Sequence, residues 1–119
     1  MASRRSERVS GLLREAVAEI VLYEVKDPRV GAVTITDAAV SPDFREAKIF
    51  FTTRRAAEQA AALAGLRSAT GYIKRQIAAR LRLRHTPDLQ FLYDTTLERA
   101  DRLENLLRQA GGRGQGESD

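Results

Sequence analysis

The first twenty-five residues carry the strictest apolar periodicity in the chain. Its positions repeat at the i, i+3, i+4, i+7 spacing of one helix face and are Val9, Leu12, Leu13, Ala16, Val17 and Ile20. The pattern predicts an amphipathic helix from about Ser6 to Val25, with the Ser6 hydroxyl as its N-cap. Asp27-Pro28 ends this helix because the residue before a proline is pushed out of the helical region, and Gly31 then frees the backbone for a turn.

Two stretches after this turn alternate apolar and polar side chains, as half-buried strands do. They are Val33–Thr36 and Ala47–Thr52, and the turn residues Ser41-Pro42-Asp43 between them favour an antiparallel hairpin. The alternation breaks over residues 37–40, which indicates a bulge. A third alternating stretch follows Pro87 after a helical crossover, so it can lie parallel to its neighbour in a mixed sheet.

The crossover is predicted to be helical with a break. Residues 54–66 are alanine-rich, and Gly65 is expected to interrupt this first part. The small residues Ala69-Thr70-Gly71 then lead into a second helical stretch, from Tyr72 to about Leu83. This arrangement predicts a helix–kink–helix unit.

The last element is a helix that a capping box opens. Thr95-Thr96-Leu97-Glu98 has the capping-box pattern, and the helix is expected to run to about Ala110. The whole order predicts an α+β fold in which helices pack on one face of a three-stranded sheet. We expect one domain over residues 1–110 and a flexible C-terminal tail over residues 111–119.

Composition excludes several kinds of site. The chain has no cysteine, so disulfide scaffolds, thiolate nucleophiles and Cys-ligated metal sites are ruled out. No apolar run approaches the roughly 18 residues of a membrane span, and the N-terminus is unlike a signal peptide, so we expect a cytoplasmic protein. The common nucleotide-binding and hydrolase motifs are missing, and His85 is the single histidine. We therefore expect no catalysis, no metal and no cofactor.

The net charge of +4 comes from one window of the chain. Residues 59–87 hold no acid and six bases, which are Arg67, Lys74, Arg75, Arg80, Arg82 and Arg84. The rest of the chain carries −2. Such concentrated charge is typical of a polyanion-binding face, and the alternative is a solvated helix face whose bases pair with acids elsewhere in the fold.

The predicted kink lies inside this basic window. In KH domains a G-x-x-G loop between two helices lets the nucleic-acid backbone approach main-chain N–H groups closely. This chain has A-x-G at Ala69-Thr70-Gly71, followed by Lys74 and Arg75, and the shorter motif should give a kink and not a loop. A packing kink that binds nothing is the alternative interpretation.

Four segments of the chain occur together in a characteristic order and spacing. They are Lys26–Gly31, Val40–Asp43, Ala69–Ile73 and Leu81–Asp94. Together they resemble the ribosome-binding factor A family, and the resemblance extends from about Arg5 to Leu107. It implies a type-II KH-like domain with an A-x-G motif, in a non-enzymatic bacterial ribosome-maturation protein.

The resemblance also implies partners. Family members bind the free 30S small subunit, support late 16S rRNA maturation and 5′-end processing, and help growth in the cold, with assembly GTPases acting nearby. We expect a monomer that has no membrane partner. The predicted RNA-binding residues are Ala69, Thr70, Gly71, Lys74, Arg75, Arg82 and Arg84, with second-rank contacts from Arg4, Arg5, Arg8, Arg29, Arg45 and Lys48. Phosphate contacts from all six bases of the window would give a log–log salt slope of about −4.

Three other functions stay open on the sequence alone. The chain could be a generic KH-type module that binds single-stranded RNA away from the ribosome. It could be a protein–protein interaction module whose basic face docks an acidic partner. It could also be a small nuclease that uses scattered acids such as Asp94, Glu98 and Asp101, although the capping box and the helix dipole already account for the last two.

Overall fold

The computed structural model describes residues 4–114 of the 119-residue chain. The elements in chain order are α1 (Arg4–Tyr23), the short 3₁₀ turn η1 (Pro28–Val30), β1 (Val33–Val40), β2 (Glu46–Thr53), the 3₁₀ turn η2 (Ala56–Glu58), α2 (Gln59–Leu81), β3 (Asp88–Tyr93) and α3 (Thr96–Gly114). This is the predicted α+β order. No helix among residues 4–114 is long and apolar enough to cross a bilayer.

The sheet confirms both predicted pairings. Its strand order is β1-β2-β3, with β1 antiparallel to β2 and β3 parallel to β2. Phe51 is central, because it lies opposite Ile35 of β1 and Tyr93 of β3, and its ring meets the Tyr93 ring edge-on at 5.5 Å between centroids. The register shift between β1 and β2 falls between Ile35 and Asp37, just before the stretch where the sequence predicts a bulge.

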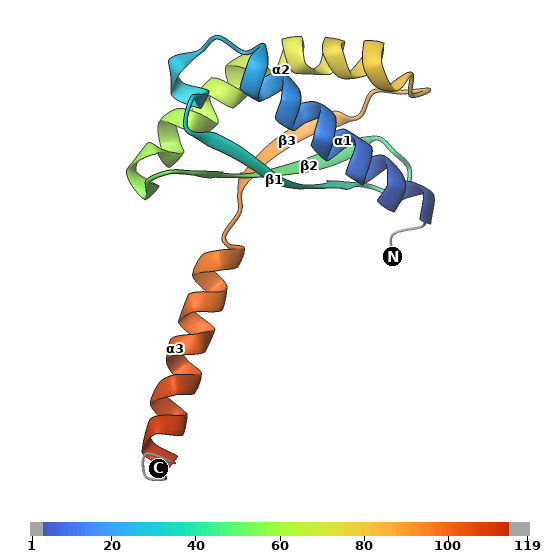
Figure 1. The fold of residues 1–119 in the computed structure, drawn as a ribbon. Helices are drawn as coiled ribbons and strands as arrows, with labels where there is room; N and C mark the ends of the chain where they lie inside the picture. The colour runs from blue at the N-terminus through green and yellow to red at the C-terminus, as the bar shows by residue number, and fades with distance from the viewer. Residues whose placement is uncertain (1–3, 115–119) are drawn as a thin grey trace.

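Helices α1 and α2 lie side by side on one face of this sheet (Figure 1). Most of the predicted α1 stripe is in the core, but Leu12 is 45% exposed. The N-cap prediction is wrong: α1 begins at Arg4, so Ser6 lies inside the helix and its side chain is fully buried. The helix also ends at Tyr23, two residues earlier than predicted.

Helix α2 is continuous where two helical stretches are predicted. Gly65 does not interrupt it, and no loop forms at the A-x-G motif. Figure 1 shows its axis turning between the green first half and the yellow second half. The Thr70 hydroxyl donates a hydrogen bond of 3.0 Å to the Leu66 carbonyl, and such bonds often bend helices. The helix ends at Leu81, before the predicted Leu83, because Arg82 has a left-handed backbone with φ of 51°.

Helix α3 departs from the predicted packing. It projects away from the sheet (Figure 1), and none of its described side chains belongs to the core cluster. Its four leucines, Leu97, Leu103, Leu106 and Leu107, are 58–72% exposed. Apolar spacing predicts a helix with an apolar face, but it does not say what covers that face.

The two ends of α3 also differ from the prediction. At its start, the Thr96 N–H donates a 2.9 Å hydrogen bond to the Asp94 carboxylate, in place of a Thr95–Glu98 capping box. At its end, the helix continues to Gly114, so residues 111–114 of the predicted flexible tail are helical. Residues 115–119 of that tail lie outside the described part of the chain.

Candidate nucleic-acid interface

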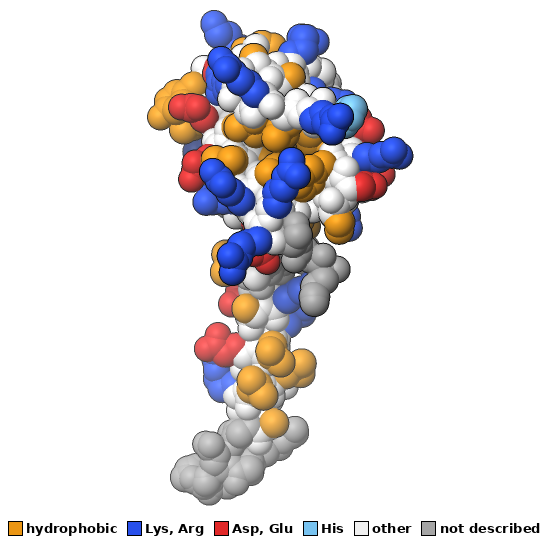
Figure 2. All heavy atoms as spheres, turned by 90° about the vertical axis from the view of Figure 1, so that its right-hand side faces the viewer, with side chains coloured by type: hydrophobic (Ala, Val, Ile, Leu, Met, Phe, Trp, Pro, Cys, Tyr) orange, Lys and Arg blue, Asp and Glu red, His pale blue; other side chains and the backbone are white. Residues whose placement is uncertain are grey.

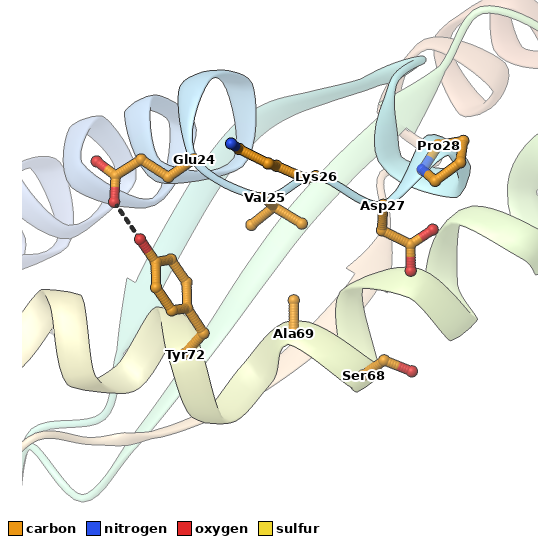
Figure 3. A pocket seen from close by; sticks show the side chains of 8 residues that line it. All are labelled: Glu24, Val25, Lys26, Asp27, Pro28, Ser68, Ala69 and Tyr72. Carbon is orange, nitrogen blue, oxygen red and sulfur yellow. Dashed lines mark hydrogen bonds between the residues drawn. The ribbon is translucent and has the colours of Figure 1, made fainter.

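The A-x-G motif lies beside an open groove between α2 and the loop that leaves α1. We call it the kink groove; its volume is about 580 Å³, and it is lined by Glu24, Val25, Lys26, Asp27, Pro28, Ser68, Ala69 and Tyr72. In Figure 3, Val25 and Ala69 point toward each other across the groove, whereas the Lys26 side chain points away from α2. Of the three predicted kink residues only Ala69 lines the groove.

A glycine keeps the two walls of this region close together. A Cβ placed on Gly65 would stand 2.9 Å from Cγ1 of Val30 and 3.1 Å from Cβ of Arg29. The first of these separations is shorter than real Cβ contacts allow, so α2 and η1 could not pack this closely around a larger residue. The sequence therefore needs glycine here for helix packing and not for a break.

The two acids that line the kink groove are already paired with cations. Asp27 accepts bonds from the Arg29 guanidinium, the shortest at 2.6 Å, and from the Arg29 backbone N–H at 2.9 Å. Glu24 accepts bonds from the Arg80 guanidinium and from the Tyr72 hydroxyl. These bonds, led by those from Arg29 and Arg80 respectively, lower the pKa of Asp27 and the pKa of Glu24 below their ordinary values. Neither carboxylate is left as an uncompensated negative charge at the kink.

Two of the six cations in the basic window pair with acids, as the alternative interpretation expects. The Lys74 ammonium lies 2.7 Å from the Asp88 carboxylate at the start of β3. Arg80 turns the other way, toward α1, where it pairs with Glu19 and Glu24. The window is therefore not one continuous strip, because its bases point to different sides of α2.

Two other cations of the window stay exposed, one on α2 and one just after its end. Arg75 and Arg82 are exposed, and neither forms an ion pair with any residue in the described range 4–114. The Arg75 guanidinium lies over the A-x-G motif, since its Nη1 would be 3.5 Å from a Cβ on Gly71. Nothing else crowds Gly71, which is itself exposed. A phosphate that approaches this turn would meet a bare backbone flanked by a free guanidinium.

A second hollow lies at the far end of α2. We call it the hairpin pocket; its volume is about 740 Å³, and it is lined by Arg5, Val9, Val40, Asp43, Phe44, Arg45, Leu83, Arg84, His85, Thr86, Pro87 and Asp88. Figure 2 views this end of the molecule and shows Lys and Arg side chains around an apolar patch. The pocket thus brings together Arg5, Arg45 and Arg84, three predicted contacts from distant parts of the sequence.

Sequence reasoning missed Phe44 as a site residue. It lies in the hairpin turn with φ of 62°, and the Arg5 guanidinium carbon is 5.2 Å from the centroid of its ring. Its position as the one aromatic residue in the turn Ser41–Arg45 was an available signal. His85, which the sequence places at a helix end with no assigned role, also lines this pocket.

The other predicted contacts do not line either hollow, although Arg29 is bonded to two residues of the kink groove. Arg4 and Arg8 are exposed on α1. Lys48 is exposed on β2 between buried Ala47 and Ile49, so strand alternation places it on the sheet face opposite the helices. Arg29 is held by Asp27 and donates to the Ser68 hydroxyl at 3.4 Å.

The acids near the third strand do not form a metal-binding cluster. Asp94 accepts a 2.6 Å hydrogen bond from the Thr36 hydroxyl in addition to the bond from Thr96. Across the described chain, no group of three or more His, Asp or Glu side chains could hold a metal ion. The arrangement can offer exposed cations, a glycine backbone that can be approached closely, and the aromatic ring of Phe44, which suits an anionic polymer.

Comparison with known proteins gives consistent matches. The family model for ribosome-binding factor A matches residues 5–107. The ribosome-binding factor A of Azoarcus sp. (strain BH72) is 44% identical over 107 residues, which cover 89% of this chain and 85% of the relative. The crystal structure of ribosome-binding factor A from Thermus thermophilus is 27% identical, with a TM-score of 0.66, and the match covers 74% of this chain and 94% of that one.

A third match comes from a structure fitted into a complex. It is a homology model of the Thermus thermophilus ribosome-binding factor A, fitted into the cryo-EM map of a complex of that protein with the 30S subunit. It is 28% identical to this chain, with a TM-score of 0.60 and coverage of 72% of this chain and 91% of that one. These neighbours agree with the KH-like α+β fold predicted from the sequence.

Proposed function

Because the chain belongs to the ribosome-binding factor A family, we propose that it binds the free 30S ribosomal subunit and supports late maturation of 16S rRNA, including 5′-end processing. The fitted 30S complex of the Thermus thermophilus relative supports this choice of partner. The proposal extends to a role in growth at low temperature and to action close to assembly GTPases. It also includes a cytoplasmic location and a monomeric state.

The observation that carries the proposal is the position of Arg75 and Arg82. Arg75 is exposed on the kinked helix and Arg82 just after its end, and neither takes part in the ion pairs that neutralise Lys74 and Arg80. Guanidinium groups that have no acidic partner bind phosphate oxygens in a fork geometry and stack on bases. The bent backbone at Gly71 lies beside Arg75, so a ribose-phosphate chain could contact main chain and side chain together.

Binding of this kind is non-catalytic. The residues at the kink supply charge and shape. The Tyr72 hydroxyl does bond to the Glu24 carboxylate there, but Glu24 raises the pKa of Tyr72, which disfavours a nucleophilic phenolate, and Arg80 holds the same carboxylate. Phosphate contacts carry little sequence information, so recognition would rest on the shape of the rRNA and on salt-dependent attraction. The chain would act by holding an rRNA segment in place while other factors cut or fold it.

The test combines sedimentation with charge reversal. The full-length protein should co-migrate with free 30S subunits and not with 70S ribosomes, and cells that lack it should accumulate 16S precursor in the cold. The double variant Arg75→Glu/Arg82→Glu should lose 30S association while its circular dichroism and melting temperature stay unchanged. The matched control is Arg99→Glu/Arg102→Glu, which reverses two exposed arginines on α3 and should leave association intact.

The rival functions give different results. A protein–protein module would keep 30S association after charge reversal at Arg75 and Arg82. A generic KH-type module would bind single-stranded RNA but not co-migrate with 30S particles. A nuclease would cleave precursor rRNA in the presence of a metal ion. Normal levels of mature 16S rRNA in cold-grown cells that lack the protein would overturn the proposed role in maturation.

A further inference from the structure

The hairpin pocket is chemically different from the kink groove. Three exposed arginines from α1, the hairpin turn and the loop after α2 converge on it, and its walls are partly apolar, with Val9, Val40 and Leu83. Its volume of about 740 Å³ lies within the range of about 300–1,000 Å³ that is usual for small-molecule sites. A pocket with a cationic rim and partly apolar walls suits a ligand whose anionic groups contact the rim and whose flat, apolar group enters the pocket.

Of the two acids that line the pocket, only Asp88 is neutralised by a cation from outside the rim. Asp88 pairs with Lys74 at 2.7 Å. Asp43 accepts bonds from the Ser41 hydroxyl and the Arg45 backbone N–H, at 2.7 and 3.1 Å. By contrast, Arg5, Arg45 and Arg84 form no ion pair with any other residue of the described range. Three arginines against the one carboxylate of Asp43 therefore leave the rim with a net positive charge for an anionic ligand.

Phe44 is held in an unusual backbone conformation at this site. The turn fixes it through a 2.9 Å bond from its N–H to the Ser41 carbonyl, while its φ is 62°. A glycine would adopt this φ without strain, so the aromatic ring is what the position supplies. The ring packs against the core cluster but stays partly exposed, beneath the Arg5 guanidinium. An aromatic ring that already stacks a planar cation is a suitable platform for a base.

We propose that the hairpin pocket holds one unstacked base of single-stranded RNA, with the base on the Phe44 ring and the flanking phosphates on Arg5, Arg45 and Arg84. The base replaces part of the contact that Arg5 now makes with the ring, and Arg5 moves to the other face of the base or to a phosphate. This site rests on the proposed RNA-binding function, and it lies at the C-terminal end of α2, whereas the kink groove lies beside the middle of that helix.

The experiment uses the full-length protein and a single-stranded RNA octamer that contains 2-aminopurine, whose fluorescence falls when it stacks on an aromatic ring. Binding of the octamer to the unchanged protein should quench the fluorophore. Phe44→Leu should abolish the quenching and weaken binding by about 5- to 150-fold, which is the range for loss of one base–aromatic stack. Phe44→Tyr keeps an aromatic ring at this position and should retain both the quenching and the affinity. The matched control is Phe50→Leu, which removes a half-buried ring on the opposite face of the sheet and should change neither.

The salt dependence of RNA affinity distinguishes the loss of base stacking from the loss of a phosphate contact. Phe44→Leu should leave the slope of log affinity against log salt unchanged, because it removes no phosphate contact. Arg84→Gln should reduce the slope by about 0.7 and keep the quenching. This second variant lies in an exposed loop, so it keeps the proposal testable if Phe44→Leu proves unstable.

Several outcomes would overturn the pocket and leave the proposed function standing. One is that Phe44→Leu binds the octamer as tightly as Phe50→Leu, with unchanged quenching. Another is that adenosine monophosphate binds as tightly as the octamer, which would make this a free-nucleotide site. A third is that polyglutamate displaces the octamer as well as unlabelled RNA does. If the unchanged protein bound neither the octamer nor 30S subunits, the proposed function itself would fail.

Discussion

The Tyr72 hydroxyl donates a 2.8 Å hydrogen bond to the Glu24 carboxylate, which joins the residue after the A-x-G motif to the end of α1. Arg80 binds the same carboxylate from about two helical turns further along α2. One acid thus connects both the bent part of α2 and its last turns to the neighbouring helix. The bend is stabilised by charge and hydrogen bonding as well as by the Thr70 hydroxyl.

This relationship predicts a dependence of stability on pH. The Arg80 and Tyr72 bonds lower the pKa of Glu24 from its ordinary value of 4.5, so their stabilisation is present above that value and is lost as pH falls through the lower folded-state pKa. The Glu24 bond raises the pKa of Tyr72 above 10.0, so this bond is lost only at still higher pH. The stabilisation should therefore persist from about pH 5 to pH 10 and fall toward pH 3.

Substitution of Tyr72 tests that dependence. Tyr72→Phe should lower the melting temperature at pH 7, and it should lose less stability than the unchanged protein between pH 5 and pH 3. Thermal unfolding by circular dichroism at each pH measures the difference. Tyr23→Phe is the control, because Tyr23 is a neighbouring tyrosine that is 73% exposed. If the melting temperatures of the Tyr72→Phe variant and the unchanged protein fell equally between pH 5 and pH 3, the predicted role of this bond would be contradicted.

The contact between Gly65 and Val30 predicts that alanine is harmful at one helical glycine and helpful at another. Gly65→Ala should cost about 1–3 kcal/mol of unfolding free energy, because its Cβ would stand 2.9 Å from Val30 Cγ1. Gly11→Ala should stabilise the fold by about 0.5–1 kcal/mol, since a Cβ on Gly11 of α1 meets nothing within 4 Å. Urea unfolding measures both. Equal effects of the two substitutions would show that helix propensity, and not the approach of α2 to η1, governs Gly65.

The fold was largely predictable because periodicity determines which residues face inward. The α1 stripe, the alternation in the strands and the turn at Ser41–Asp43 each depend on local chemistry. The position of α3 was not predictable in the same way. Its leucines have helical spacing, but spacing carries no information about whether a partner surface exists. Ser6 was misassigned because a buried serine inside a helix and an N-cap serine look alike in sequence.

The candidate site was predictable only in part, because charge pairing is a tertiary property. Lys74 and Arg75 are neighbours in sequence, yet only Lys74 meets an acid, and that acid is fourteen residues away on β3. The hairpin pocket combines Arg5, Phe44 and Arg84 from three segments that only the folded chain brings together. No local pattern in the sequence predicts that these three residues lie together.

The exposed backbone at Gly71 predicts a substitution that separates stability from function. Gly71→Ala adds a Cβ whose nearest neighbour is Arg75 Nη1 at 3.5 Å, an ordinary contact. Alanine should therefore raise the unfolding free energy by about 0.5–1 kcal/mol, because Gly71 is inside a helix. Its methyl group should also keep the RNA backbone from close approach and weaken binding to 30S subunits. Ala78→Gly, at an exposed position of the same helix, is the opposite control and should lower stability without weakening binding. Unchanged 30S affinity in Gly71→Ala would contradict a direct role for the kink.

The isolation of α3 predicts that the rest of the fold does not need it. A chain that ends after Thr96 keeps the Asp94 bonds to Thr36 and Thr96. Its unfolding free energy should therefore lie within about 0.5 kcal/mol of that of the full chain. For comparison, Ile73→Ala removes a fully buried core side chain and should cost about 2–5 kcal/mol. Urea unfolding of the three proteins tests this. A loss for the truncated chain as large as that for Ile73→Ala would mean that α3 packs on the domain in solution.

The division of the basic window predicts which cations control salt dependence. Of its six bases, Lys74 and Arg80 are paired with acids, and four remain for phosphate, so the contribution of the window to the log–log salt slope should be roughly −3. Arg75→Gln and Arg82→Gln should each reduce the magnitude of the slope by about 0.7. Lys74→Gln/Asp88→Asn removes both members of an ion pair and should leave the slope almost unchanged. Titration of a single-stranded RNA at several salt concentrations measures all three. A reduction for the Lys74→Gln/Asp88→Asn variant as large as that for Arg75→Gln would mean that Lys74 leaves Asp88 to bind RNA.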